Sequence, residues 1–477
     1  MRPVAVGCSL VVAASCACSP GVRPSLSWRP CSQARTVYCA TLRVPVDWAR
    51  PHGGTITLTL AKLPASDPAH RIGAVLDVPG GPGESGVDAL SRLSAAHRAM
   101  RRRFDVVSYN PRTNVAQAIL PRACTRPGPS LTDPRTRGAY ARQAAVLDRS
   151  VGDCRRADRS GLLAHLDSIS IARDMDAVRR ALGQERLTFV ARSNGGVPMT
   201  AYARLFPQHV RAAYFDGVPD HVDAWSDSGA MWLTGTEKAF TRFASWCAAT
   251  AACRLHGRPV RSLWRALLKQ AGTAPLPVRS GPFRGRRLTA WHLKISAPVF
   301  LVDAASDRTS WKAFAEAIDR ARHGDGSGFG DTSFGMSQIW TAPVSLAMQC
   351  ADGLWGRTGY ADLRRSRRAA ERSSADFGSV SFTTIACTGW TTPVVNPPRP
   401  LAGGRLPPFL GSGSDPGDYE TTRRLLRHVP GSVTIHYDGP GHVSYLNGTA
   451  GGACVVGHLV RYIENLRLPP PTAVCRP

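Results

Sequence analysis

The chain has 477 residues, of which 43% are hydrophobic and 20% are charged. This composition is typical of a globular protein with a large hydrophobic core, and it excludes wholesale disorder. No apolar stretch beyond the N-terminus is long and charge-free enough to span a bilayer, so the sequence predicts no transmembrane segment.

The formal net charge of +26 raises the question of nucleic-acid binding. Almost all of the positive charge is arginine, and the arginines are spread along the whole chain. A nucleic-acid-binding surface instead concentrates basic residues on one element with interleaved aromatics. We therefore expect no nucleic-acid partner, although a basic enzyme would associate electrostatically with an anionic surface such as a cell wall.

The N-terminus has the pattern of an export signal. The mostly apolar stretch Val4 to Ala17 is too short for a membrane anchor and ends in small residues that suit a cleavage site. We read residues 1–18 as the export signal and the protein as secreted. The alternative is a lipid anchor at the cell surface through Cys18 or Cys16.

Ten cysteines lie beyond this leader: Cys31, Cys39, Cys124, Cys154, Cys247, Cys253, Cys350, Cys387, Cys454 and Cys475. An even number in an exported chain favours disulfides. No Cys-x-x-Cys pair occurs among them, so we expect no zinc site and no other metal. The sequence does not determine the connectivity, and the simplest guess pairs each cysteine with its neighbour along the chain.

Strands and helices alternate in the first half of the chain, which is typical of a parallel sheet wrapped by helices. We expect an α/β protein of the α/β-hydrolase fold, with a mostly parallel sheet flanked by helices. The predicted strands are Ile56–Leu63, Gly73–Val78, Phe104–Tyr109, Leu187–Ala191 and Val210–Phe215, with helices from Ser168 to Gly183 and from Ser193 to Phe206.

The pattern changes between about Val218 and Pro400, where helical segments and long loops replace the alternation. We therefore expect a largely helical cap inserted over residues 218–400, between two parts of the hydrolase core at 19–217 and 401–477. In the second part the predicted elements are strands Phe409–Gly411 and Val433–Tyr437 and helices Tyr419–His428 and Val455–Leu466.

Ser193 lies in the sequence Ala191-Arg-Ser-Asn-Gly195, where a predicted strand turns directly into a helix. Such a turn holds a serine hydroxyl clear of the sheet and requires small neighbours, as in the pattern G-x-S-x-G. Here alanine replaces the first glycine. The alternative is an ordinary helix cap, because serine is a preferred capping residue.

Chain order supports the catalytic interpretation. An α/β-hydrolase presents its nucleophile, acid and base in the order Ser, Asp, His at successive strand ends. Asp415 follows the strand that ends at 411–414, and His442 follows the strand that ends at Tyr437. Asp415 could be an ordinary turn residue and His442 a loop histidine with satisfied hydrogen bonds, but three candidates at three strand ends favour a Ser193–Asp415–His442 triad.

The segment Pro79-Gly-Gly-Pro-Gly83 follows another predicted strand. Its glycines let the backbone approach a ligand, so the N–H of Gly81 is expected to join that of Asn194 in an oxyanion hole. A phosphate loop is excluded because the lysine and Ser/Thr of that motif are absent. A plain tight turn is the remaining alternative.

These motifs resemble those of the secreted actinobacterial tripeptidyl aminopeptidases, which belong with the prolyl iminopeptidases among α/β-hydrolase peptidases. The resemblance runs from about Trp28 to Cys475. It implies Ser193 as nucleophile, His442 as general base, Asp415 as the acid that orients it, and an oxyanion N–H near Gly81. The matching segments are Cys39–Asp47, Gly80–Gly83, Ala172–Arg179, Leu205–Pro207, Asp216–Val218, Trp246-Cys247, Cys387–Trp390, Asp415-Pro416, Gly441-His442 and the tail from Cys454 to Cys475.

The chain also departs from that family. Asn110 to Gln117 lacks an acid and two glycines of the usual D-P-R-G-x-G-x-S. Asn194 stands where a tyrosine is usual, and Glu84 where a small residue is common. The triad is unchanged, so we expect a remodelled pocket in an active enzyme.

The expected function is an exported aminopeptidase that releases short peptides or single residues from peptide N-termini through an acyl-enzyme, without a cofactor. A substrate ammonium entering a capped site must be paired with a carboxylate, for which Glu84 and Glu237 are candidates, followed by Asp220 and Asp223. The alternatives are an esterase or lipase-like hydrolase, or a wall-associated protein whose catalytic residues are vestigial.

Overall fold

The computed structural model describes residues 26–32, 36–223, 225–302, 308–354, 359–401, 403–414, 417–446 and 449–476. The predicted export signal, with Cys16 and Cys18, lies outside the described residues, and so does Asp415.

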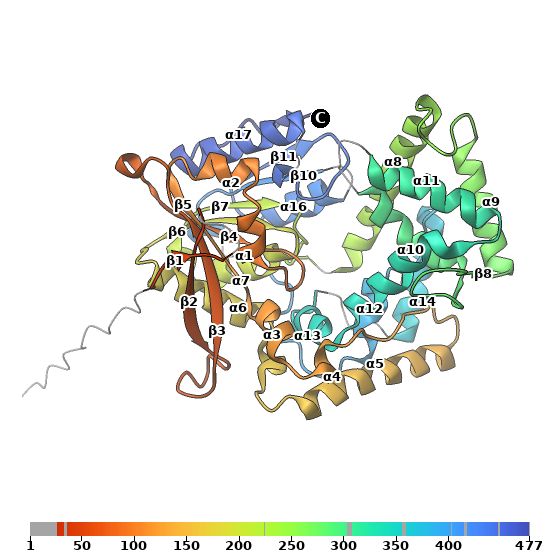
Figure 1. Ribbon diagram of the computed structural model, residues 1–477, viewed down its shortest axis with the longest axis horizontal. Coiled ribbons are helices and arrows are strands. Elements are labelled where there is room, and N and C mark those ends of the chain that lie inside the picture. Colours follow the sequence, from red (N-terminus) through yellow and green to blue (C-terminus); the bar gives the residue numbers. More distant parts are fainter. Residues whose placement is uncertain are drawn as a thin grey trace, which may run out of the picture.

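A ten-stranded sheet forms the centre of the α/β part (Figure 1). Its strands lie side by side in the order β1-β2-β3-β5-β4-β6-β7-β10-β11-β12. The first strand pairs, β1 with β2, β2 with β3 and β3 with β5, are antiparallel, and all the pairs that follow are parallel. The strands are β1 Arg29–Pro30, β2 Tyr38–Pro45, β3 Thr55–Leu63, β4 Gly73–Val78, β5 Phe104–Tyr109, β6 Leu187–Arg192, β7 Val210–Asp216, β10 Leu410–Ser414, β11 Val433–Tyr437 and β12 Val474–Cys475.

Helices cover both faces of this sheet. Apolar side chains from α1, α2 and α17 pack on one face, and those from α3, α6, α7 and α16 pack on the other. The helices are α1 Gly86–Ser91, α2 Ala95–Met100, α3 Arg112–Ile119, α6 Ser168–Ala181, α7 Gly196–Leu205, α16 Asp418–Leu426 and α17 Ala450–Asn465. The mostly parallel sheet flanked by helices confirms the predicted α/β-hydrolase fold. The carboxyl ends of its parallel strands meet at one edge, where such folds place their sites.

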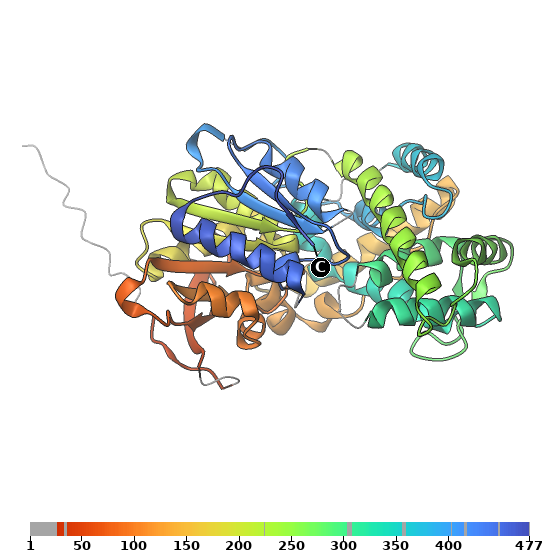
Figure 2. The ribbon, with the colours of Figure 1, turned by 90° about the horizontal axis from the view of Figure 1, so that it is seen from above.

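A second, helical part lies beside the sheet (Figures 1 and 2). It has a core of its own, in which Phe240, Trp264 and Phe314 pack together with ring centroids 5.6 to 6.3 Å apart. Its elements are α8 Trp225–Ala249, α9 Val260–Thr273, the two-stranded sheet of β8 Leu276–Pro277 and β9 Arg287–Leu288, α10 Ala290–Leu301, α11 Thr309–Arg322, α12 Met336–Trp340 and α14 Tyr360–Ser373.

Not every described helix of the predicted insertion belongs to that second core. Side chains of α13 (Pro343–Ala351) and α15 (Phe382–Ala386), together with Leu363 of α14, join the apolar cluster of the α/β part. They lie with α4 (Arg122–Thr125) and α5 (Arg137–Ala157), which precede the nucleophile in the sequence. Residues 218–400 therefore form a helical part together with a segment packed against the sheet and its helices.

Among the described residues, five disulfides close local loops. They join Cys31 to Cys39, Cys124 to Cys154, Cys247 to Cys253, Cys350 to Cys387, and Cys454 to Cys475. Each links neighbouring cysteines, so the simplest pairing guessed from the sequence is confirmed. Within the described ranges, no helix is both long enough and apolar enough to cross a membrane.

Candidate active site

Ser193 lies at the sharp turn between β6 and α7. Its φ of +49° is in the left-handed region that side chains rarely adopt, as expected for a strained nucleophile elbow. Gly195 lets this turn approach β4, since a Cβ there would lie 2.7 Å from the carbonyl oxygen of Val78 and 2.5 Å from that of Pro79. The elbow predicted from Ala191 to Gly195 is therefore present.

His442 connects Ser193 to a carboxylate. Its Nε2 lies 2.8 Å from Oγ of Ser193, and its Nδ1 lies 2.6 Å from Oδ2 of Asp418. The carboxylate can only accept a hydrogen bond, so it fixes the tautomer with the proton on Nδ1. Nε2 then has a lone pair directed at the serine hydroxyl. The arrangement can deprotonate that hydroxyl for attack on a carbonyl.

The acid in this arrangement differs from the one the sequence predicted. Asp415 directly follows β10, but it lies outside the described residues, and the carboxylate bonded to His442 belongs to Asp418. Asp418 is the first residue of α16, and it is 7% exposed. The Asp415 assignment therefore stays a prediction, and Asp418 is the described carboxylate that contacts the histidine. The strand-end rule does not separate acids three residues apart, and the sequence held no separate signal for Asp418.

Backbone at the end of β7 lies against the acid and the base. Gly217 has a φ of +59°, and a Cβ there would lie 2.8 Å from Oδ2 of Asp418 and 3.2 Å from Nδ1 of His442. Burial by itself lowers the pKa of His442, but the carboxylates of Asp418, Asp216 and Glu84 together outweigh it, so this pKa is raised above its usual value. The contact with Asp418 therefore stabilises the imidazolium that forms when the serine loses its proton.

Asp216, the last residue of β7, holds the loop that follows His442. Its carboxylate accepts hydrogen bonds from the backbone N–H groups of Ser444 and Tyr445, at 3.1 and 2.8 Å, and from the hydroxyl of Tyr214 at 3.1 Å. Burial raises the pKa of Asp216 to about 6. The sequence singled out this aspartate only as part of a family segment, since its partners come from a distant loop.

The predicted oxyanion loop approaches the nucleophile through Gly80. A Cβ at Gly80 would lie 2.9 Å from the Cβ of Ser193, so only glycine fits there. Gly81 follows with a φ of +107°, and Asn194, next to Ser193, is 5% exposed. The loop and the elbow thus lie together, and the assignment of the Gly81 and Asn194 N–H groups to the oxyanion belongs to the proposed function.

The predicted amine-binding carboxylates already have partners. Glu84 accepts hydrogen bonds from the N–H of Gly80 and from Arg192. Glu237 lies 2.9 Å from Arg261 and accepts a hydrogen bond from Ser374. These contacts argue against either carboxylate as the partner of a substrate amine.

The two further acidic candidates lie near the start of the helical part. Asp223 lies 2.6 Å from Arg427, so it is also paired. Asp220 is 2% exposed and accepts hydrogen bonds from the backbone N–H groups of Val222 and Asp223. Neither contacts Ser193 or His442.

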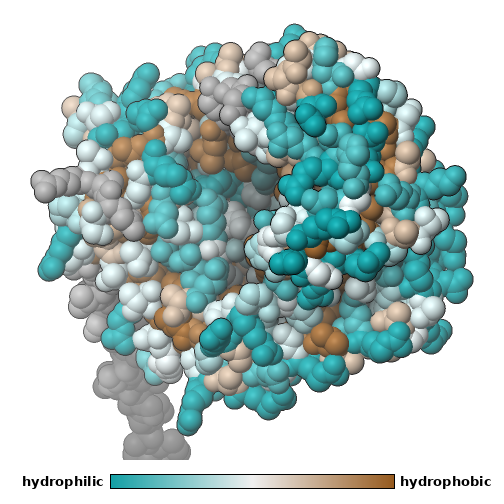
Figure 3. Space-filling model, turned by 45° about the vertical axis from the view of Figure 1, so that its right-hand side comes forward, coloured by the Kyte–Doolittle hydropathy of each residue, from teal (hydrophilic) through white to brown (hydrophobic). Residues whose placement is uncertain are grey.

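The helical part reaches the loop that precedes the histidine. Arg242, on α8, donates a hydrogen bond of 2.7 Å to Asp438, four residues before His442. Figure 3 shows a hollow in the molecular surface, bordered by both hydrophobic and hydrophilic residues. A cap in contact with the base loop can restrict how a substrate enters.

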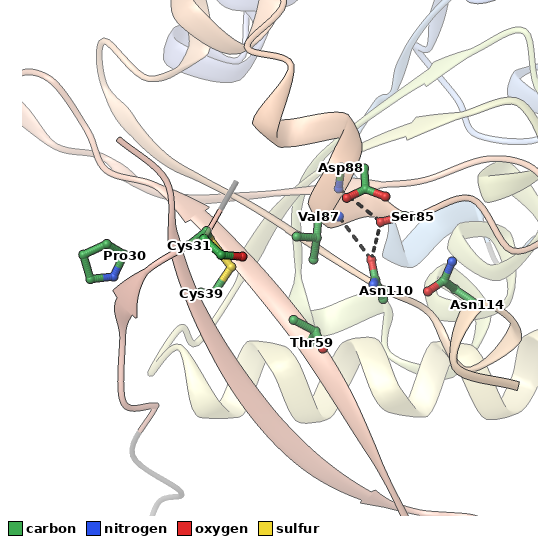
Figure 4. A pocket seen from close by; sticks show the side chains of 10 residues that line it. Pro30, Cys31, Cys39, Thr59, Ser85, Val87, Asp88, Asn110 and Asn114 are labelled. Carbon is green, nitrogen blue, oxygen red and sulfur yellow. Dashed lines mark hydrogen bonds between the residues drawn. A yellow bond between two sulfur atoms is a disulfide. The ribbon is translucent and has the colours of Figure 1, made fainter. Parts of the chain in front are cut away.

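A pocket of about 490 Å³ lies beside the start of α1 (Figure 4). There Asn110 accepts hydrogen bonds from the hydroxyl of Ser85 and the N–H of Val87, while Asn114 donates one to the carbonyl oxygen of Gly83. The side-chain oxygen of Asn110 thus serves as an acceptor at this position. The lining residues are Pro30, Cys31, Ser32, Cys39, Thr59, Ser85, Val87, Asp88, Asn110 and Asn114, which do not include the triad.

Among the described residues one group has the spacing of a metal site. Ligand atoms of Cys454, His458 and Cys475 lie within 4.8 Å of one another. Cys454 and Cys475 are joined in a disulfide, so they offer no thiolates. This group does not fit a resident metal ion.

Two family models match successive parts of the chain. Residues 73–290 match one described as the alpha/beta hydrolase fold, and residues 374–475 match one described as TAP-like protein. Serine protease Hip1 of Mycobacterium tuberculosis (strain ATCC 25618 / H37Rv) is 26% identical, over 99% of this chain and 95% of that protein. Carboxylesterase B of the same strain is 28% identical, over 96% and 91%.

Tripeptidyl aminopeptidase of Streptomyces lividans is 26% identical, over 83% of this chain and 76% of that protein. The crystal structure of a proline iminopeptidase from Mycobacterium smegmatis is similar with 14% identity and a TM-score of 0.37, over 89% of this chain and 97% of that one. The resemblance inferred from the motifs is confirmed by the family models. One model covers the part that bears the elbow and the other covers the tail that bears the histidine, so the chain has the α/β-hydrolase fold and its tail is similar to TAP-like proteins.

Proposed function

We propose that the protein is a serine peptidase that cleaves through an acyl-enzyme, with Ser193 as nucleophile, His442 as general base and Asp418 as the acid that orients it. One observation carries this proposal: the continuous hydrogen-bonded chain from Ser193 Oγ through the His442 ring to Asp418. A vestigial site would have no need to keep all three groups at 2.6 to 2.8 Å.

The reaction follows from this geometry. Nε2 of His442 takes the proton of Ser193 as the hydroxyl attacks the scissile carbonyl, and Asp418 stabilises the imidazolium. We assign to the N–H groups of Gly81 and Asn194 the stabilisation of the negative charge that develops on the carbonyl oxygen. His442 then gives its proton to the leaving group, and water hydrolyses the ester with the same histidine as base.

The proposed substrates are peptides with a free N-terminus, from which short peptides or single residues are released. Two relatives carry peptidase names, and the TAP-like match covers the tail that holds Asp418 and His442. The contact of α8 with the loop before His442 supports end-on entry beneath a cap. Since Glu84 and Glu237 are paired elsewhere, recognition of the amine falls to other polar groups.

An esterase is the second candidate, because Carboxylesterase B is among the relatives and the same triad serves ester hydrolysis. The test compares a chromogenic tripeptide with a free N-terminus, its acetylated twin and a simple aryl ester, with Ser193→Ala as the blank. A large fall in kcat/KM on acetylation supports the aminopeptidase. Equal rates for the two peptides, or turnover of the ester alone, would favour the esterase.

We further propose that the protein works outside the cell. The five disulfides support an oxidising compartment. The net charge of +26 favours association with an anionic cell wall. Fractionation of a producing culture tests this, since the medium and the salt wash of the cell wall should hold the activity. A detergent-extracted, lipid-modified form would instead support the anchor at Cys18 or Cys16.

A further inference from the structure

The glycine-rich loop is tied to the nucleophile elbow by one side chain. Oε2 of Glu84 accepts a hydrogen bond of 2.9 Å from the N–H of Gly80, and Oε1 accepts one of 3.2 Å from Nη2 of Arg192. Arg192 is the residue before Ser193. The Glu84 carboxylate therefore joins the part of the loop nearest Ser193 to the residue that precedes it.

The arginine end of this connection is held firmly. Nη1 of Arg192 donates to both carboxylate oxygens of Asp77, at 2.6 and 2.7 Å, and its side chain is only 3% exposed. Nη1 also lies 3.3 Å from the hydroxyl of Tyr445, which donates to Asp77 at 3.1 Å. β4 supplies Asp77 and the loop after His442 supplies Tyr445. The guanidinium of Arg192 is therefore held in a fixed position between these two elements.

The loop end needs such support. Gly80 packs so closely on Ser193 that a Cβ would overlap the serine side chain, and Gly81 follows in a left-handed conformation. A glycine-rich backbone has many accessible conformations, so the direction of its N–H groups depends on contacts made elsewhere. The N–H of Gly80 is already used by Glu84, which leaves that of Gly81 as the next loop donor.

We propose that Glu84 is a positioning residue, which fixes the oxyanion loop against the nucleophile elbow by bridging the Gly80 N–H to Arg192. This rests on the proposed function. Preorganised donors accelerate acyl transfer because they need no rearrangement when charge develops, and small displacements of such donors reduce the rate strongly. Glu84 therefore acts on the chemical step and on acylation of Ser193, and does not act on substrate affinity.

The same carboxylate contributes to the electrostatics of the base. Burial lowers the pKa of His442, while the carboxylates of Asp418, Asp216 and Glu84 raise it, so that the net shift is upward. Removing the charge of Glu84 should move the acid limb of the pH–rate profile to lower pH. A side chain that only supported the fold would change the stability and leave this limb in place.

The test uses a fluorophosphonate probe, which phosphonylates an activated serine and loses fluoride, together with turnover of the preferred substrate. Glu84→Gln keeps an acceptor for the Gly80 N–H but loses the ion pair, and Glu84→Ala loses both. We expect the labelling rate and kcat to fall about 10-fold in the first and on the order of 100-fold in the second, with KM nearly unchanged.

Glu185→Gln is the matched control. Glu185 is exposed and lies just before β6, at the end of the strand opposite to Ser193. The Glu185→Gln variant should react with the probe and turn over substrate at the wild-type rates. Thermal melts of all variants verify that they are folded.

The outcomes separate this inference from the proposed function. If wild-type protein is not labelled, the proposed function fails. If wild type is labelled and Glu84→Ala is labelled as fast, the positioning role is overturned. A rise in KM confined to free-amine peptides, with unchanged labelling, would overturn it in favour of amine binding by Glu84.

Discussion

Oδ2 of Asp418 lies 2.6 Å from Nδ1 of His442. Asp418 is on the first turn of α16 and not at the end of β10, the strand that precedes this helix. We expect Asp418→Asn to lower kcat on the order of 10⁴-fold, because the amide can donate to Nδ1 and so favours the wrong imidazole tautomer. Ser193→Ala should cost on the order of 10⁶-fold. Steady-state assays of the purified variants measure both.

Asp415→Asn is the informative comparison, since the two aspartates are three residues apart and the substitution is the same. It should retain most of the wild-type kcat. A loss as large as that of Asp418→Asn would restore Asp415 as the orienting acid.

Gly217→Ala tests the close packing around the acid and the base. The added Cβ would meet Oδ2 of Asp418 at 2.8 Å and would also strain the backbone, whose φ is +59°. We expect kcat to fall at least 10-fold, because small displacements of catalytic groups have large effects on rate. Gly183→Ala is the control: its φ is +67°, but a Cβ there meets nothing within 4 Å.

Both alanine variants should lose about 1 kcal/mol or more of stability through the positive φ. Only Gly217→Ala should also lose catalytic activity. Equal activity losses in the two variants would mean that the effect is general destabilisation and that the contact with Asp418 is not required.

The sequence predicted the parallel strands well because each is a short apolar run closed by turn residues. β4, β5 and β11 begin and end where the pattern predicted, and Ser193 and His442 lie beside each other as the strand order required. α5 was not predicted, although it has 21 residues, because it is polar around most of its surface and buries only Leu147, Ser150, Val151 and Cys154. These four positions follow helical spacing over about two turns only, so the apolar pattern covers just part of the helix.

The parts of the site that the sequence missed depend on contacts between distant segments. Glu84 was predicted to bind an amine because it follows the glycine-rich loop, but Arg192 occupies it. That pairing joins residues 108 positions apart, and the local pattern holds no sign of it. Asp418 was not predicted for a similar reason, since a strand end identifies a region of several residues and side-chain direction selects among them.

The disulfides should contribute unequally to stability. The Cys350–Cys387 bond closes a separation of 37 residues and the Cys247–Cys253 bond one of 6. In the chain-entropy model a longer closed loop removes more freedom from the unfolded state, and the difference here is about 1.5 kcal/mol. We therefore expect the double serine variant at 350 and 387 to unfold at lower denaturant than the one at 247 and 253.

Denaturant titration of the two variants beside the wild type measures this difference. Thiol counting on the oxidised wild type gives the reference and should find none of the ten described cysteines free. Greater destabilisation from the short loop would contradict the entropic account for this protein.

Stability should also depend on pH through Asp352, a buried carboxyl at the end of α13. Oδ1 accepts hydrogen bonds from the N–H of Ser168 and from Asn396, and Oδ2 accepts one of 2.6 Å from the hydroxyl of Ser168. Burial raises the pKa of Asp352 to about 7, with a further rise from the nearby Asp167 carboxylate, while these hydrogen bonds oppose the shift. Asp352 thus links α6, α13 and the segment that returns from the helical part.

The sign of the effect follows from that upward shift. In the unfolded chain Asp352 ionises near its ordinary pKa of 3.8, whereas in the folded protein it keeps its proton up to about pH 7. Its contribution to stability is therefore full below about pH 4 and is lost as the pH rises through 7, by up to a few kcal/mol.

Asp352→Asn removes this titration, so its stability relative to the wild type should rise with pH across that window. Denaturant midpoints at pH 5 and 8 measure the change, with Glu316→Gln, at an exposed position of α11, as the control. A difference between Asp352→Asn and wild type that stays constant from pH 5 to 8, or that falls, would show that Asp352 is ionised in the folded protein throughout.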